Sequence, residues 1–252
     1  MDKPWVTKMI SLIVCHRNKT LLEALKKSVE STIGVPYEFV IIDNLDNQYT
    51  IAQAYNKGAN EAKYDCLVFV HEDVEFLTKD WGCALMDILK KKSIGAVGVA
   101  GSTYLNERGV WAEVGVPFVK GRLVHRDGGR LFVSTYSEEK RDEKVVVLDG
   151  CFLACRKEVA KEVPFDETMD GFHFYDVDWS LRIVQKYDVL VTQSFMILHK
   201  SYGKKDEDLN YGRLRKKFVE KHKGKLPFTN QGLKPDYKNI QFYQEHELGR
   251  KP

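Results

Sequence analysis

In the stretch from Leu67 to Phe76, a run of apolar residues stops abruptly at His71, Glu72 and Asp73. The apolar run is short, β-rich and uninterrupted, which is typical of a strand covered on both faces. Ligands bind beyond the carboxyl ends of strands in open α/β sheets, so the three polar side chains stand where a site is expected. Two carboxylates and an imidazole can hold a divalent cation, which can in turn hold phosphates. A charged turn that merely ends the strand is the alternative interpretation.

Two earlier apolar stretches end in the same way. Residues 9–15 are followed by a polar cluster at 16–18, and residues 37–42 are followed by Asp43 and Asn44. The segments between the strands carry helical periodicity, so the chain begins β-α-β-α-β and predicts a parallel sheet with right-handed crossovers. The three polar clusters then meet at one edge of the sheet, which favours a binding site over three unrelated turns.

The rest of the chain continues the α/β pattern with two departures. Residues 101–142 are rich in glycine and scattered aromatics and predict an insertion of hairpins, with a turn at Gly128 and Gly129. Residues 204–224 are strongly charged and predict a helix with Leu209, Leu214 and Phe218 on its inward face. The other elements are expected as follows: helices over 79–92 and about 175–186, and strands over 95–99, 144–148, 151–155, 188–192 and 195–198.

Composition narrows the class of protein. The 252 residues, 43% hydrophobic and 30% charged, are typical of a globular domain, and the net charge of 39 − 36 = +3 gives no support for a nucleic-acid partner. Five cysteines without CxxC spacing favour a reduced, cytoplasmic setting. We expect neither a signal peptide at the N-terminus nor a membrane span, since apolar runs of the needed length are missing.

The order of motifs carries a family resemblance. The matching pieces are residues 10–17 with Asp43 and Asn44, residues 55–59, 68–74, 149–151 and 172–182, and finally Leu198 with His199. In this order the chain resembles the nucleotide-sugar-dependent glycosyltransferases of the GT-A fold, and specifically the family 2-like group. The resemblance implies a mostly parallel central sheet flanked by helices over residues 1–203, with a C-terminal helical extension and tail over 204–252.

The resemblance also implies an activity. A sugar passes from a nucleotide diphosphate sugar to the hydroxyl of a carbohydrate or lipid-linked acceptor, with inversion in one displacement, and Mn²⁺ or Mg²⁺ assists. The setting implied is bacterial surface polysaccharide or glycoconjugate synthesis. Two positions depart from the family pattern. His71 stands where the metal motif usually has its first aspartate, and Tyr175 stands where a glutamate usually precedes the base.

Roles follow for individual residues by the same resemblance. Asp73 and His199 are the expected metal ligands, and Asp176 is the expected general base. Asp178 lies two positions further along the predicted helix, so it points elsewhere, and we expect it to cap the helix or to pair with Arg182. The residues expected at the nucleotide sugar are Cys15, Arg17, Asp43, Asn44, Asn56, Lys57, His71 and Glu72. The residues expected on the acceptor side are Gly150, Cys151, His173 and Asp178.

Alternatives stay open at this point. The same carboxylates could serve a metal-dependent nucleotidyltransferase or hydrolase, although a glycine-rich phosphate loop does not follow the first strand. The two departures favour a non-catalytic nucleotide-sugar-binding relative. The basic residues of 204–225 predict a solvated helix face or, as a second hypothesis, a peripheral contact with an anionic membrane.

Overall fold

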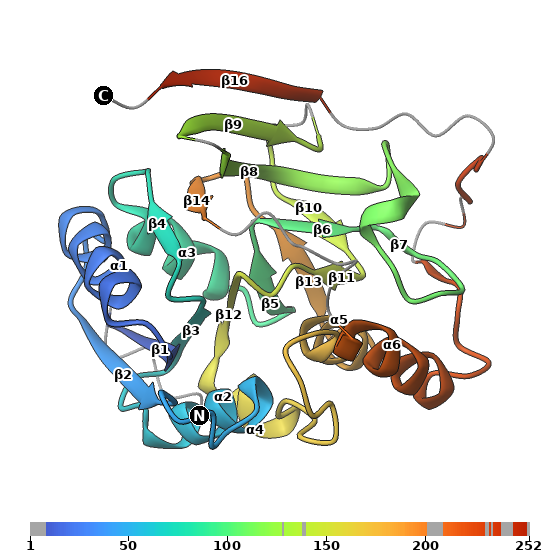
Figure 1. The fold of residues 1–252 in the computed structure, drawn as a ribbon, viewed down its shortest axis with the longest axis horizontal. Coiled ribbons are helices and arrows are strands. Elements are labelled where there is room, and N and C mark those ends of the chain that lie inside the picture. Colours follow the sequence, from blue (N-terminus) through green and yellow to red (C-terminus); the bar gives the residue numbers. More distant parts are fainter. Residues whose placement is uncertain are drawn as a thin grey trace.

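The computed structural model describes residues 9–127, 129–137, 140–200, 209–229, 232, 234–237 and 244–250. Its central sheet has seven strands in the order β10-β13-β5-β12-β3-β1-β2. The strands are β1 (Ile10–His16), β2 (Tyr37–Asp43), β3 (Cys66–Val70), β5 (Ile94–Gly98), β10 (Glu143–Val145), β12 (Phe152–Arg156) and β13 (Asp188–Val191). Figure 1 shows this sheet crossing the middle of the molecule with helices on both sides.

The predicted β-α-β-α-β start is confirmed. Strand β1 pairs in parallel with β2 on one side and with β3 on the other. Strands β5 and β13 run in the same direction as these three, whereas β12 and β10 run against their neighbours. The reversed β12 lies between β3 and β5, and it brings Gly150 and Cys151 next to the end of β3.

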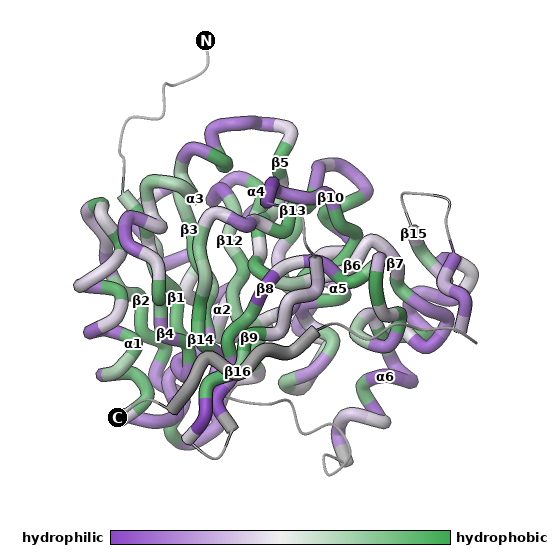
Figure 2. Tube along the Cα trace, turned by 90° about the horizontal axis from the view of Figure 1, so that it is seen from above, coloured by the Kyte–Doolittle hydropathy of each residue, from purple (hydrophilic) through white to green (hydrophobic). Residues whose placement is uncertain are grey.

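Alternate residues of the buried strands fill two separate cores. Leu67 and Phe69 of β3 belong to one apolar cluster, while Cys66, Val68 and Val70 belong to the other. The first cluster is covered by α2, α4, α5 and α6, and the second by α1 and α3. The helices are α1 (Lys19–Thr32), α2 (Ile51–Glu61), α3 (Trp81–Leu89), α4 (Lys157–Glu162), α5 (Tyr175–Ile183) and α6 (Leu209–Lys221). Figure 2 shows the central strands mostly in the green of apolar residues and the flanking helices with purple polar segments.

The insertion after β5 forms the predicted hairpins. Strands β8 and β9 pair as far as Asp127 and Arg130, and β16 adds to β9. The second sheet has the order β11-β6-β8-β14-β4, and a short pair joins β15 to β7. The bounds are β4 (Val74–Phe76), β6 (Ala100–Ser102), β7 (Tyr104–Leu105), β8 (Val119–Asp127), β9 (Arg130–Thr135), β11 (Val147–Leu148), β14 (Ile197–His199), β15 (Phe228–Thr229) and β16 (Gln244–Arg250), with a single 3₁₀ turn at Ala112–Val114.

Helix α6 packs on the same core as the preceding elements. Leu214 and Phe218 are fully buried in the first cluster, as the sequence predicts, and α6 lies beside α5 (Figure 1). The part of the predicted helix before Leu209 lies outside the described residues. The proposed boundary at residue 203 stays a prediction, and the packing shows that α6 contributes to the core of the sheet domain. None of the helices in the described ranges is long and apolar enough to cross a lipid bilayer.

Candidate active site

Two strand ends bring three potential metal ligands together. His71 follows β3, Asp73 lies in the turn that leads into β4, and His199 ends β14. Strand β14 pairs with β4 so that His199 lies opposite Val74, next to Asp73. One ligand atom from each of the three side chains lies within 4.8 Å of the others. Residues 126 positions apart in the chain are therefore close enough to bind one ion.

The chemistry of these side chains fits a divalent cation. Nε2 of His199 is buried, lies 3.4 Å from Oδ1 of Asp73, and has no hydrogen-bond partner among the described residues. A buried ring nitrogen that makes only this long contact with a carboxylate is costly unless something else binds it. Burial and the neighbouring His199 lower the pKa of His71 to about 4, so at neutral pH this ring is uncharged, as a metal ligand must be. Burial acts to lower the pKa of His199, but Asp73 outweighs it and the pKa is raised.

A hydrogen-bonded chain connects His71 to the expected base. Oη of Tyr175 lies 2.7 Å from Nε2 of His71 and donates to the carbonyl oxygen of Gly150, 3.0 Å away. The N–H of the same Gly150 donates to Oδ2 of Asp176 over 2.8 Å. A Cβ atom at position 150 would lie 2.2 Å from Oη of Tyr175, so only glycine allows this close approach. Tyr175 and Asp176, the first residues of α5, are thus both held against the backbone of Gly150.

The carboxyl group of Asp176 is prepared to exchange a proton near neutral pH. Burial raises its pKa, and the carboxylate of Asp149 raises it further, to about 7. Such a value suits a general base, which must be ionised yet able to accept a proton at working pH. Burial also raises the pKa of Tyr175 well above its ordinary value, so the phenol stays protonated.

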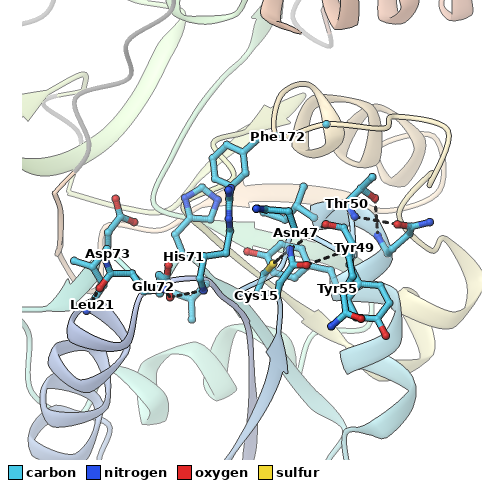
Figure 3. Close-up of a pocket in the computed structure, with 18 of the residues that line it drawn as sticks. Cys15, Leu21, Asn47, Tyr49, Thr50, Tyr55, His71, Glu72, Asp73 and Phe172 are labelled. Atoms are coloured by element: carbon cyan, nitrogen blue, oxygen red, sulfur yellow. Dashed lines mark hydrogen bonds between the residues drawn. The ribbon is translucent and has the colours of Figure 1, made fainter. Parts of the chain in front are cut away.

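A cleft of about 730 Å³ opens beside His71 and Asp73, and Figure 3 shows the side chains that line it. His71, Glu72 and Asp73 form one end, and the loop between β2 and α2 forms the other. Phe172 is 48% exposed, and its ring lies 5.0 Å from that of His71. Asp176 and His199 do not line this cleft: His199 clusters with His71 and Asp73, and Asp176 is connected to His71 through Tyr175 and Gly150. The arrangement offers a cleft large enough for a polar ligand, with a titrating carboxyl group outside its lining.

Besides His71, four of the residues expected at the nucleotide sugar line the cleft, namely Cys15, Arg17, Asn44 and Glu72. Oε2 of Glu72 accepts from the backbone N–H groups of Arg17 and Asn18 and lies 3.1 Å from Nδ1 of His16. This carboxylate joins the ends of β1 and β3, so its main visible role is to shape the cleft. The buried amide of Asn44 contacts Sγ of Cys15 and both backbone groups of Tyr49, which fixes the loop opposite.

Three expected residues point elsewhere. Asp43 is exposed, and its Oδ1 accepts from the N–H of Leu45, as in a turn. Asn56 holds the loop at Phe165 through both ends of its amide, and Lys57 pairs with Glu61 on the helix surface. None of these three lines the main cleft. Their expected contacts with a nucleotide stay predictions.

The structure also separates the residues expected on the acceptor side from one another. Gly150 and Asp176 are in contact, whereas Cys151 is buried in the second core and burial raises its thiol pKa. The ring of His173 packs against Tyr211 at 5.2 Å. Asp178 is fully buried on the other side of α5, where its carboxylate binds Arg182, as the spacing predicts.

Sequence reasoning missed several residues that the structure brings to the site. Asn47, Gln48 and Tyr49 line the cleft from the loop after β2, and Asp149 is the charged neighbour of Asp176. The polar loop directly after a strand end was a usable signal for the first group. For Asp149 the signal was weaker, because an Asp-Gly pair is an ordinary turn sequence.

Comparisons with known proteins identify the family and the fold. A family model described as "Glycosyltransferase like family" matches residues 11–222. A search of curated proteins finds no match.

Two solved structures show the same fold. One is GalNAc-T7 with UDP, GalNAc and Mn²⁺, at a TM-score of 0.59 and 14% identity over 85% of this chain and 48% of that one. The other is the mannosyltransferase PcManGT from Pyrobaculum calidifontis with GDP-Man and Mn²⁺, at a TM-score of 0.52 and 13% identity over 85% of this chain and 64% of that one. The chain thus spans from about half to under two thirds of these proteins.

Proposed function

Because the chain belongs to the glycosyltransferase-like family, we propose that it transfers a sugar from a nucleotide diphosphate sugar to an acceptor hydroxyl. One observation carries the proposal. The side chains of His71, Asp73 and His199 converge within 4.8 Å at the end of a polar cleft, and a carboxyl group with a pKa of about 7 is connected to His71 through Tyr175 and Gly150. This combination meets the two needs of the reaction, which are charge neutralisation at the leaving group and proton removal at the nucleophile.

The leaving nucleotide diphosphate gains negative charge on its β-phosphate, and a bound divalent cation would supply the Lewis acid that stabilises it. His71, Asp73 and His199 would hold this cation. Two imidazoles with one carboxylate favour Mn²⁺ over Mg²⁺, which prefers oxygen ligands. Mn²⁺ accompanies the nucleotide or nucleotide sugar in both structural neighbours, which supports the same choice here.

The donor would occupy the cleft with its pyrophosphate toward Asp73 and its nucleoside toward the loop of Asn47, Gln48 and Tyr49. The backbone of this loop is fixed by Asn44, so its polar groups are held ready for a ligand. Arg17, directly after β1, lines the cleft and suits a phosphate.

Asp176 would take the proton from the acceptor hydroxyl as that oxygen attacks the anomeric carbon. Its Oδ2 is oriented by the N–H of Gly150, and ionisation near neutral pH makes it an effective base. A base that acts on the acceptor opposite the leaving group implies inversion at the anomeric carbon in one displacement. The anomeric configuration of the product, read by NMR, tests this part of the proposal.

The acceptor in this proposal is a carbohydrate, free or lipid-linked, in a cytoplasmic pathway of polysaccharide synthesis. A peripheral membrane contact by α6 is a weaker element of it. Arg213 and Lys217 pair with Asp170, and Lys221 pairs with Asp166 and Asp178, so much of the basic face is used within the protein. Lys204 and Lys205 lie outside the described residues. Sedimentation with anionic vesicles at low salt tests the contact, and no binding there would leave a solvated helix.

The function is tested by incubating the protein with a panel of UDP- and GDP-sugars, with Mn²⁺ and with excess chelator. We expect release of free nucleotide diphosphate that needs the metal, and about a 100-fold loss of it in His199→Ala. Release of nucleotide monophosphate would instead indicate a nucleotidyltransferase or hydrolase. Donor binding without turnover across the panel and a set of acceptor sugars would indicate a non-catalytic relative, and either result overturns the proposal.

A further inference from the structure

Tyr175 stands between the candidate metal cluster and the candidate base, and it is 2% exposed. Its hydroxyl oxygen has two partners: Nε2 of His71 at 2.7 Å and the carbonyl oxygen of Gly150 at 3.0 Å. Each contact is short enough to be a hydrogen bond, and each therefore needs one proton between its two heavy atoms.

The number of available protons decides which atom donates in each of these two hydrogen bonds. A carbonyl oxygen only accepts, and a phenol has a single proton to donate, so the contact with Gly150 uses the proton of Tyr175. The contact with His71 must then use a proton of the imidazole, which makes Nε2 the donor and Oη the acceptor. The opposite assignment would leave two oxygen atoms 3.0 Å apart without a proton between them, at a buried site.

A neutral imidazole carries one N–H, so a proton on Nε2 leaves the lone pair on Nδ1. A histidine binds a metal through its unprotonated nitrogen, and its other nitrogen commonly donates to an orienting group. Such orienting groups hold the ring in place and select the tautomer. In this chain the orienting atom would be a phenol oxygen, which adds no negative charge to the site.

We propose that Tyr175 is a positioning residue that fixes His71 as the Nε2-protonated tautomer and so presents Nδ1 of His71 to the cation. The proposal rests on the proposed function for the presence of a cation. It assigns a role to the position that departs from the family's usual glutamate, and it explains why Gly150 cannot carry a side chain. The residue whose carbonyl oxygen receives the phenol proton also orients Asp176 through its N–H, so one glycine supports both sides of the site.

The tautomer is measured first, in the metal-free protein. Labelling the seven histidines with ¹⁵N and assigning His71 by the signal lost in His71→Gln gives the protonation of each ring nitrogen directly. We expect Nε2 protonated and Nδ1 unprotonated at pH 8. A His71 ring protonated on Nδ1 would overturn the proposal whatever reaction the protein catalyses.

The second measurement is Mn²⁺ affinity by calorimetry, with Mn²⁺ alone as the ligand. We expect Tyr175→Phe to raise the Kd by about 10- to 100-fold, the usual effect of losing an orienting partner. Tyr187→Phe is the matched control, because it removes a phenol that bonds to Glu162 on the surface, and its Kd should equal that of the wild type. Equal affinity in Tyr175→Phe and wild type contradicts the positioning role alone. Failure of the wild type to bind Mn²⁺ contradicts the metal site itself and with it the proposed function.

Discussion

Asp176 and Asp178 lie in the first turn of α5 and face opposite surroundings. Asp178 points toward α6, where its carboxylate contacts Arg182 at 2.8 Å, His222 at 2.8 Å and Lys221. Burial alone would raise its pKa, but the hydrogen bond from His222 and the two neighbouring cations outweigh burial and lower it to about 2. Asp176 faces Gly150 and Asp149, with a pKa of about 7. Environment, and not residue type, thus separates a permanent charge from a titrating group.

This contrast suggests a division of labour within one helix. The Asp178 side joins α5 to α6 and holds the C-terminal helix against the core, which is a structural task. The Asp176 side keeps a carboxylate beside the carboxylate of Asp149, which is unfavourable for stability. Groups held in such unfavourable surroundings are typical of functional sites. The comparison yields the predictions that follow.

The largest expected effect on stability is at Asp178. Asp178→Asn leaves Arg182, Lys221 and His222 facing a neutral group, and we expect the free energy of unfolding to fall by about 3 kcal/mol. Urea unfolding at pH 7 measures it. Asp188→Asn is the control, because Asp188 pairs with Lys144 at the surface and should lose at most about 0.5 kcal/mol. Equal losses in the two variants would remove the structural half of the comparison.

At Asp176 we expect the opposite effect on the free energy of unfolding, because removing this carboxylate should stabilise the protein. Its pKa is higher in the folded chain than the ordinary 3.8, so protonation stabilises the native state. This contribution is complete below about pH 4 and is lost as the pH rises through about 7. Asp176→Asn should therefore be more stable than wild type at pH 8, by on the order of 2 kcal/mol, and equal to it near pH 4. Thermal unfolding at both pH values checks this, and a less stable variant at pH 8 would show that the carboxylate is favourably paired.

The smallest effect concerns Asp149, the charged neighbour of Asp176. Asp149→Asn removes one of the two causes that raise the pKa of Asp176, after burial. The acid limb of the pH–rate profile at saturating Mn²⁺ should move to lower pH by roughly one pH unit. An unchanged limb would mean that burial alone sets the pKa or that another group is being observed.

Much of this site could be predicted from the sequence because the ends of buried strands are easy to recognise in it. An apolar run that stops at polar residues located His71, Asp73 and Asn44, and a four-residue spacing paired Asp178 with Arg182. The position of β12 between β3 and β5 does not follow, since pairing between distant strands is decided by packing of the whole sheet. The directions in which the Asp43 and Asn56 side chains point could not be predicted either, because local turn and loop contacts compete for the same polar atoms.

The same limit applies to roles that depend on hydrogen-bond partners. Glu72 is acidic and stands at the right strand end, yet backbone N–H groups occupy one of its oxygens. In the sequence, Tyr175 only marks the absence of the glutamate that is usual at this position in the family. In the structure its hydroxyl joins His71 to Gly150. Identity and spacing give the position of a side chain along an element and its partners within one helix, whereas partners from distant parts of the chain are given only by the fold.

The most direct test of the account is transfer by Asp176→Asn, measured as labelled sugar moved from the donor to an acceptor at pH 8 with saturating Mn²⁺. The substitution keeps the shape of the side chain and its acceptor for the Gly150 N–H but removes the basic oxygen. We predict that kcat falls by about 100-fold or more while the Mn²⁺ and donor affinities stay within about two-fold of wild type. Near-normal transfer by Asp176→Asn would contradict the assignment of the base, and with it the functional half of the comparison between the two aspartates.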